Sequence, residues 1–432
     1  MRYLPVFLLL LPAAAFAAEV HSLTLPQVVD LALRQNPDVV IARLDEQKAQ
    51  LAVRVAKDPF SPKVYAGSGA AKIWGYPNSI DGSAPSILQV RTDMAVFNRP
   101  KSLELAGARE SARGAALQTH SKMEEVAFRA ATVFLDAAQA ARSADIARHE
   151  LDSLQRVKDF VTARISEGRE LPIAGRRADV DLARTRQRLE ILATDQAYAE
   201  GSLAMVLGFP PDDRVRALTD DDSVAASLEK ALPASADAAV ETALITSTEL
   251  KSLKSQMEVK NLDARAERSA RLPQVNLVAQ YALFAQSAYQ DYFSQRFQRN
   301  NGELGVSISV PVLVGTGAGA RAAQAEIEVN RLRQQVNLQR NQISLETRRG
   351  YADVKNCADA HSLAKLDLDV AREQLSILLS QHEEGRVTAQ QVEEARVTEQ
   401  EKWLEYYASR DRLTRARLNL LRQMGTLLSA LR

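Results

Sequence analysis

The chain has 432 residues, of which 55 are basic, 54 are acidic and only 5% are aromatic. Loss of Arg2 with an N-terminal signal leaves 54 basic against 54 acidic residues, and this balance excludes a nucleic-acid partner, which would need a basic excess. The single cysteine, Cys357, excludes an internal disulfide.

Residues 1–17 are typical of a secretory signal peptide. Arg2 supplies the positive charge, residues 6–11 form a short apolar run, and an Ala-x-Ala motif predicts cleavage after Ala17. The run is too short for a membrane anchor, which needs roughly 20 apolar residues. Because no cysteine follows the run, we expect an exported mature chain that starts at Ala18 and carries no N-terminal lipid.

The first half of the mature chain is predicted to begin with a helix and two strands. A capping hydroxyl at Thr24, with a glutamine three residues on, opens a helix that should end at about Asp58. A β-like stretch follows from Val64 to about Tyr76. Apolar and polar residues then alternate over residues 88–96, which is the period of a β-strand.

Two helices complete this half. The first, from about Lys101 to Glu167, contains no proline and carries apolar residues at helical spacing. A tight turn over residues 168–172 separates it from the second helix. That helix ends at Leu207, because Gly208 is a typical helix terminator.

The second half repeats this order. A helix over about residues 236–271 precedes strands at residues 275–283 and 304–310, whose apolar residues alternate with polar or small ones. A helix of about 65 residues then ends at Gly385. The last helix carries a heptad-like apolar series at Leu413, Leu420 and Leu427.

Matching turns at a fixed offset indicate an internal duplication. A Glu-Gly-Arg turn recurs 217 residues later, at Glu167, Gly168 and Arg169 and then at Glu384, Gly385 and Arg386. The glycines that end the two halves, Gly208 and Gly425, have the same offset. We therefore expect a first repeat over residues 18–210, an equatorial linker over residues 211–234 and a second repeat over residues 235–432.

The four predicted strands favour a membrane β-barrel that is shared between chains. Each strand is about 9–12 residues long, as a tilted strand that crosses a bilayer requires, and has one apolar face. Four strands cannot close, and lipid does not tolerate an open sheet edge. Two chains would make an eight-stranded barrel filled by side chains, so an open pore favours three chains and twelve strands.

The helix lengths predict four helical columns per chain. A helix of about 65 residues is about 100 Å long at 1.5 Å per residue. The helix that ends at Leu207 and the helix over residues 236–271 together approach that length, so we expect them to stack end to end. The last helix and the helix from Thr24 should stack in the same way. The expected fold is mainly α, a trimeric channel-tunnel with a twelve-stranded barrel and a long helical tunnel.

The first predicted helix contains the segments Leu23-Thr24-Leu25-Pro26 and Asn36-Pro37. Together with the duplicated halves and the paired Glu-Gly turns, these segments resemble the TolC family of outer-membrane efflux proteins. The resemblance implies a homotrimer in the lipid of the cell outer membrane, with its helical part in the periplasm. It also implies two partners, a periplasmic adaptor and an inner-membrane pump of RND or ABC type.

The resemblance further implies two sets of functional residues. The adaptor would dock at the hairpin ends, at Glu167, Gly168, Arg169, Glu384, Gly385 and Arg386. The family has acidic gate residues six and nine positions after the second tip glycine, and these positions are Gln391 and Glu394 here. Gln391 departs from the acidic pattern, so Glu393 is a further gate candidate.

Five arginines follow closely after the first turn, namely Arg176, Arg177, Arg184, Arg186 and Arg188. Their role has two interpretations. They form either a solvated helix face or part of the surface that docks the adaptor. The first interpretation is supported by nearby acidic residues, Asp179, Asp181 and Glu190.

The sequence contains only weak matches to motifs for nucleotide binding, metal binding or catalysis. Residues 314–320 fit a relaxed Gly-x-Gly-x-x-Ala pattern, but the helix that follows is far too long for a nucleotide-binding βαβ unit. The five histidines show no metal-ligand spacing, and no catalytic set stands out. We therefore expect no catalytic, cofactor or metal site, and a passive exit channel for small molecules or secreted substrates. The alternative is a periplasmic coiled-coil scaffold or adaptor without a pore.

Overall fold

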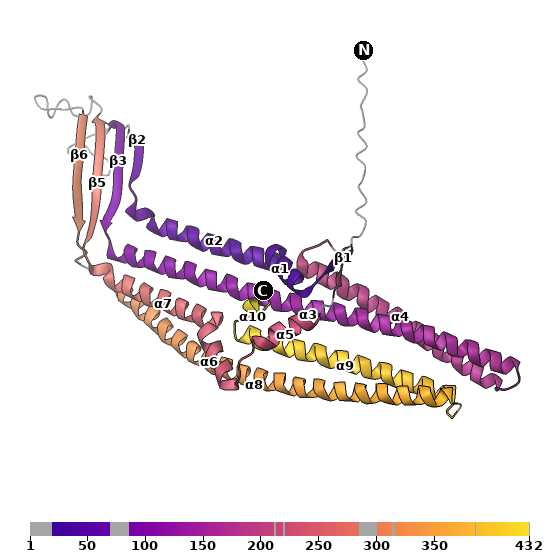
Figure 1. The fold of residues 1–432 in the computed structure, drawn as a ribbon. Helices are drawn as coiled ribbons and strands as arrows, with labels where there is room; N and C mark the ends of the chain where they lie inside the picture. The colour runs from indigo at the N-terminus through magenta and orange to yellow at the C-terminus, as the bar shows by residue number, and fades with distance from the viewer. Residues whose placement is uncertain are drawn as a thin grey trace, which may run out of the picture. The chain divides into compact units, whose positions relative to one another are not determined.

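The computed structural model describes residues 20–69, 86–210, 213–218, 221–284, 300–312, 316–384 and 386–431 (Figure 1). The predicted signal peptide and its cleavage site lie outside these residues. Contacts divide the chain into two compact units. The first unit comprises Met1–Val40, Lys122–Thr246 and Ile343–Arg432, and the second comprises Ile41–Ser121 and Ser247–Gln342.

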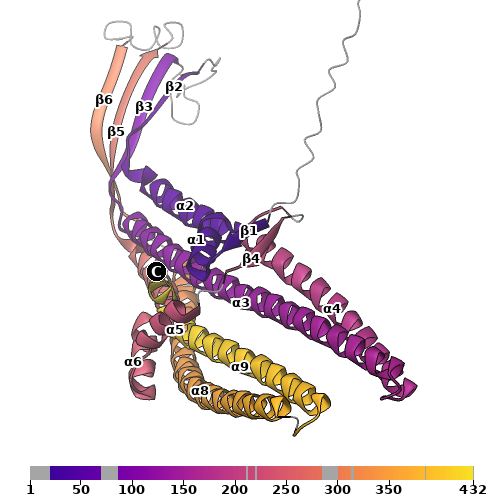
Figure 2. The same ribbon diagram turned by 45° about the vertical axis from the view of Figure 1, so that its right-hand side comes forward.

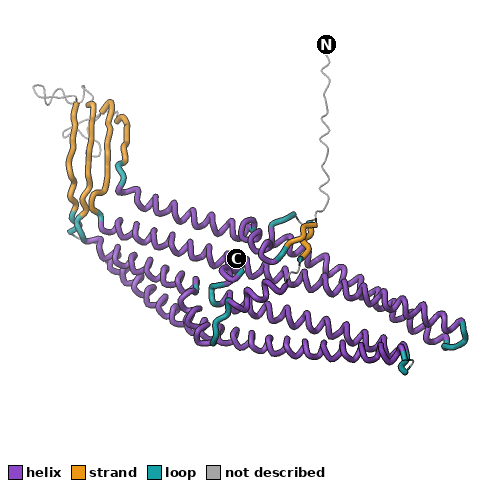
Figure 3. Tube along the Cα trace, in the orientation of Figure 1, coloured by secondary structure: helices purple, strands orange, loops and turns teal. Residues whose placement is uncertain are grey.

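The second unit contains a four-stranded antiparallel sheet, drawn in orange in Figure 3. Across the sheet, its strands are β2 (Lys63–Gly69), β3 (Ser86–Phe97), β5 (Gln274–Phe284) and β6 (Asn300–Ser309). The direct pairing of β3 with β5 makes the sheet continuous across the two halves of the chain. β2 and β6 are the edge strands of this sheet. The predicted extension of the first strand to about Tyr76 falls outside the described residues.

The register gives the sheet one apolar face and one polar face. Val306 lies opposite Leu277, and Leu277 lies opposite Met94. One position along, Ser307 lies opposite Asn276 on the alternate face. The strand periodicity predicted from the sequence is therefore confirmed for β3, β5 and β6. The polar face carries Gln89, Arg91, Asp93, Asn276, Gln280, Glu303 and Ser307.

The helices of the second unit pack closely through small residues. They are α2 (Pro37–Lys57), α7 (Thr248–Arg268) and parts of two 68-residue helices, α3 (Arg99–Ser166) and α8 (Thr316–Glu383). Thr119 of α3 donates to the Ala42 carbonyl of α2 at 3.1 Å, and Ser255 of α7 donates to the Glu110 carbonyl of α3 at 3.0 Å. A Cβ on Gly114 would lie 3.1 Å from the Ser255 hydroxyl, so this glycine lets α3 and α7 approach each other.

In the first unit, helices lie side by side in the order α4 (Pro172–Leu207), α3, α9 (Ala389–Gln423) and α8, as both views show (Figures 1 and 2). Ion pairs join neighbours, namely Lys158–Asp179 at 2.6 Å, Arg142–Asp411 at 2.7 Å and Lys402–Asp367 at 3.8 Å. Arg142 contacts both carboxylate oxygens of the buried Asp411. A largely buried ion pair of this kind favours one register between α3 and α9.

Both of the first helices of the repeats are broken, which corrects the two continuous helices that we predicted. Asn36 separates α1 (Leu25–Gln35) from α2, and Ser247 separates α6 (Ala236–Thr246) from α7. Asn36 precedes a proline, which disfavours helical backbone, and its amide donates to the Val206 carbonyl at 2.7 Å. Ser247 caps α7 by accepting from the Leu250 N–H at 3.2 Å.

The predicted end-to-end stacking is wrong in its pairing. Gly208, at φ +82°, ends α4 against α1, where a Cβ would lie 3.2 Å from the Gln35 carbonyl oxygen. Gly425, at φ +65°, follows α9 and faces Thr246 at the end of α6. Each returning helix therefore meets the broken helix of its own repeat. Helix length alone could not separate the two pairings, because the broken helices have similar lengths.

The core of the first unit lies where these breaks meet the long helices. It includes Val28, Val126, Phe134, Leu203, Leu207, Leu418, Leu421 and Leu427. Leu413, Leu420 and Leu427 are buried as the heptad-like series suggested, but Gly425 ends α9 before the short α10 (Leu427–Ala430). The three leucines are therefore not on one helix.

The predicted linker carries structure that the sequence did not indicate. Within it, β4 (Arg214–Ala217) pairs in parallel with β1 (Val20–Leu23), and α5 (Asp221–Lys230) follows. Val215 and Leu228 are buried in the core of the first unit. The linker therefore packs on this unit.

Candidate functional site at the ends of the helical hairpins

The first hairpin end, between α3 and α4, closes in a Schellman motif. Gly168 has φ +74°, a conformation that glycine adopts without strain. Its N–H donates to the Ile165 carbonyl at 3.0 Å, and the Arg169 N–H donates to the Arg164 carbonyl at 2.9 Å. Pro172 then starts α4, where its missing N–H leaves no helical hydrogen bond unmade.

The second hairpin end, between α8 and α9, contains one of the two backbone hydrogen bonds found at the first end. The Arg386 N–H donates to the Gln381 carbonyl at 2.9 Å, which matches the bond made by Arg169. Gly385 lies outside the described residues. This one backbone hydrogen bond thus recurs at the position that the sequence duplication predicts.

Each end presents an exposed Glu-Arg pair. The Arg169–Glu167 pair measures 3.2 Å and the Arg386–Glu384 pair 3.1 Å, with all four side chains more than half exposed. Exposed pairs of this kind contribute little stability, about 0–1 kcal/mol. Their charged groups are therefore available to a partner at small cost to the fold.

The two ends differ in how the returning helix starts. At α9, Thr388 and Gln391 form a capping box, because the Thr388 N–H donates to Gln391 Oε1 at 2.9 Å and the Gln391 N–H donates to the Thr388 hydroxyl at 3.4 Å. The first of the gate candidates is thus engaged in capping α9. The Thr-x-x-Gln spacing in the sequence could have predicted this role.

The other two gate candidates lie in different surroundings. Glu393 accepts from Arg396 Nη1 at 3.0 Å and from the Ser153 hydroxyl at 3.3 Å, so it connects α9 with α3. Glu394, the next residue, is exposed. The contact from Ser153 has no signal in the sequence, because Ser153 lies 240 residues away from Glu393.

The described residues include no cluster of side chains that could hold a metal ion. His361 lies against the Ser409 hydroxyl at 3.0 Å, and burial, together with the nearby Arg410, holds its pKa below the usual value. The helix that follows the glycine-rich segment, α8, has 68 residues, which is too long for a βαβ unit. Within the described part of the chain, no helix is long and apolar enough to span a membrane.

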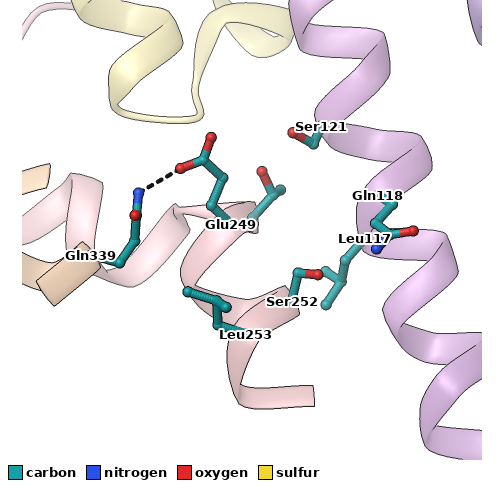
Figure 4. Close-up of a pocket in the computed structure, with 8 residues that line it drawn as sticks. Leu117, Gln118, Ser121, Glu249, Ser252, Leu253 and Gln339 are labelled. Carbon is teal, nitrogen blue, oxygen red and sulfur yellow. Dashed lines mark hydrogen bonds between the residues drawn. The ribbon is translucent and has the colours of Figure 1, made fainter. Parts of the chain in front are cut away.

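A cavity of about 300 Å³ opens between α3, α7 and α8 in the second unit (Figure 4). Its polar groups are mainly hydroxyls and amides, from Gln118, Ser121, Thr248 and Ser252. The one carboxylate in its described lining, that of Glu249, accepts from the Gln339 amide at 2.7 Å. Apart from this carboxylate, the polar groups of the lining are uncharged.

Comparison with known proteins identifies the family. The family model for outer membrane efflux proteins matches residues 28–209 and 239–426. The chain belongs to this family. No curated sequence matches the chain.

Solved structures of outer-membrane proteins share the fold of this efflux protein. The CmeC outer membrane channel of Campylobacter jejuni is 12% identical, with a TM-score of 0.70 over 93% of this chain and 86% of that one. VceC of Vibrio cholerae is 15% identical, with a TM-score of 0.67 over 93% and 96%. The MtrE outer membrane channel of Neisseria gonorrhoeae is 13% identical, with a TM-score of 0.68 over 93% and 89%.

The efflux family and this fold confirm the predicted membership of the TolC-like proteins. The chain is an outer-membrane efflux exit channel, and it lies in the outer membrane with its helical part in the periplasm. The fold is the mainly helical channel-tunnel type. A scaffold without a pore finds no support.

Proposed function

We propose that three copies of this chain form one passive exit duct of a tripartite export complex. A periplasmic adaptor would link the duct to an inner-membrane pump of RND or ABC type. The duct would carry small molecules or secreted substrates, with the pump supplying the energy. The observation that supports this proposal is the four-stranded sheet, which has one apolar face, one polar face and two edge strands.

Closure of the sheet between copies follows from the chemistry of lipid. The edge strands β2 and β6 carry backbone groups that need partners in a bilayer. Pairing β6 of one copy with β2 of the next provides these partners on every chain. Three copies give a barrel of twelve strands. Its interior is wide enough to hold water, whereas side chains would fill the interior of an eight-stranded barrel. The mass of the protein in detergent tests this count.

We propose the two hairpin ends as the docking surface for the adaptor. The backbone hydrogen bond that both ends share and their exposed Glu-Arg pairs support this role. Three copies would present six such ends in alternating sequence. A helical hairpin with charges complementary to both pairs would fit this ring. The residues assigned are Glu167, Gly168, Arg169, Glu384, Gly385 and Arg386.

The gate proposal centres on Glu394, with Glu393 and Gln391 in lesser roles. Glu394 is exposed near the hairpin end. Glu393 connects α9 with α3 through Ser153, and Gln391 caps α9. Three copies of Glu394 around the axis of a narrow pore would attract cations.

Glu394→Gln is expected to reduce the cation preference of single channels without changing assembly, because it removes three negative charges from the constriction. The reversal potential in a salt gradient should move towards zero. Glu393→Gln is the matched control and should have a smaller effect. An unchanged reversal potential in the Glu394 variant would show that this residue does not line the constriction.

We also propose that the chain arose from two fused copies of one unit. The proposed repeats, residues 18–210 and 235–432, each contain a broken helix, two strands, a 68-residue helix and a returning helix. The segment 211–234 would connect them. Residues 1–17 would direct export and be removed. Determination of the N-terminal residue of the mature protein tests the last point, with Ala18 expected.

A further inference from the structure

The apolar face of the sheet continues to the end where its strands meet the helices (Figure 1). In the last row on this face, Phe97 lies opposite Val275 and Val275 lies opposite Ile308. Directly beyond β6, Val310 and Val312 continue the same alternation, and Val312 is 92% exposed. The sheet therefore presents apolar side chains up to its junction with the helices and slightly beyond it.

Three cations lie at this junction without an ionic partner among the described residues. Lys57 ends α2, Arg99 begins α3, and Arg271 ends the short 3₁₀ helix that precedes β5. All three are exposed, and none makes an ion pair or a side-chain hydrogen bond with another described residue. We call these three residues the junction cations.

Four other cations near the junction differ from them, because each is paired with a carboxylate of the same chain. The pairs are Lys63–Asp58, Lys101–Glu104, Arg268–Glu326 and Arg321–Glu267. Each of these carboxylates therefore offsets a charge that does not belong to a junction cation. The junction cations remain as uncompensated positive charge beside the apolar face.

Exposed apolar side chains followed by unpaired cations match the boundary between the acyl chains and the phosphate groups of a lipid leaflet. Arginine can donate two parallel N–H bonds to a phosphate, and lysine offers a compact positive charge. Both side chains are long enough to lie along an apolar surface while the charged group stays at the level of the headgroups. The position of the junction cations beside the apolar face distinguishes them from cations elsewhere on the helices.

We propose that Lys57, Arg99 and Arg271 bind the phosphate groups of anionic phospholipids in the leaflet that faces the periplasm. This inference rests on the proposed placement of the sheet in the outer membrane, and it adds the class of lipid that the protein selects. The junction cations of three copies would form a band around the duct at the level where the sheet ends. Binding at this band would hold the sheet at one depth in the bilayer.

Cations farther from the sheet provide a matched control set, namely Lys48 on α2, Arg109 on α3 and Lys254 on α7. Each lies at least nine residues along the chain from the nearest junction cation, about 14 Å or more along the helix axis. The control residues are exposed and, like the junction cations, have no ionic partner in the part of the chain that the structure describes. The two sets therefore carry equal charge and differ in their distance from the apolar face.

Native mass spectrometry of protein extracted from the outer membrane tests the lipid preference. The oligomer in a mild detergent is mixed with equal amounts of phosphatidylglycerol and phosphatidylcholine, and the retained molecules of each lipid are counted. The wild type should retain the anionic lipid in several-fold excess. Replacement of all three junction cations by glutamine should remove this excess, whereas replacement of the control set by glutamine should preserve it.

Two further sets of variants separate charge from folding. The combination of Lys57→Arg, Arg99→Lys and Arg271→Lys should preserve the excess of anionic lipid, because the three charges remain. Arg99→Gln and Arg271→Gln, each made alone, should remove part of the excess, and they keep the test decisive where the triple glutamine variant does not assemble.

Equal retention of phosphatidylglycerol by the wild type and the glutamine variants of the junction would overturn the proposal. An equal loss in the junction and control variants would also overturn it, because net charge and not position would then decide the preference. Loss of adaptor copurification with unchanged lipid retention would assign the junction cations to the adaptor instead. A wild-type protein absent from the membrane fraction would refute the placement of the sheet itself, and with it the proposed function.

Discussion

Val306→Arg is expected to destabilise the membrane-inserted protein by about 2–4 kcal/mol, the usual cost of a charge on the lipid face near the bilayer midplane. The register supports this facing, since Val306 lies in a row with Leu277 and Met94. The yield of folded protein in the outer-membrane fraction, and its resistance to denaturant there, measure the loss.

Ser307→Arg is the matched control, one position along the same strand. Ser307 lies opposite Asn276 on the polar face, which borders the water-filled interior in our account. Its replacement should cost clearly less, because the new charge remains hydrated. Equal losses for the two variants would show that the apolar face of the sheet is not the lipid face.

Gly168→Leu is expected to abolish efflux while leaving the oligomer in the outer membrane. A Cβ at this position meets nothing within 4 Å, so a side chain can extend from this residue into open space. The positive φ adds strain of about 1–2 kcal/mol for a residue with a side chain, and this strain is confined to the turn. The bulky side chain would occupy the surface where the partner backbone has to approach. Efflux in cells and copurification with the adaptor measure the effect.

Gly168→Asn distinguishes the effect of the backbone conformation from the effect of side-chain size. Asparagine tolerates positive φ and is small, so this variant should retain most of the activity. Gly385→Leu should resemble Gly168→Leu because the two turns match in sequence. Normal efflux and normal copurification in the leucine variants would exclude the hairpin ends as the docking surface.

The strands and hairpin turns could be predicted from the sequence because their signals are local. Alternation over residues 88–96 and 304–310 fixes both the strand and its faces, and the register agrees with it. Gly168 and Gly208 adopt positive φ at the two helix ends that the sequence marks with glycine. Each turn depends on a single glycine, and each strand depends on a short run of neighbouring residues.

Contacts between distant segments could not be predicted in this way. Asn36 breaks a helix partly because its amide binds the Val206 carbonyl, 170 residues away. The pairing of β1 with β4 and the contact from Ser153 to Glu393 likewise join segments that have no mutual signal in the sequence. The capping role of Gln391 is different, since its Thr-x-x-Gln pattern is local and was available.

The mass of the detergent-solubilised protein tests the central claim most directly. Mature protein extracted from the outer membrane in a mild detergent, with the bound detergent subtracted, should have three times the mass of one chain. This result follows from four strands per chain, two open sheet edges and a pore wide enough for water. A stable monomer from the same membrane fraction would contradict the shared barrel, and with it the account of this chain as one third of an exit duct.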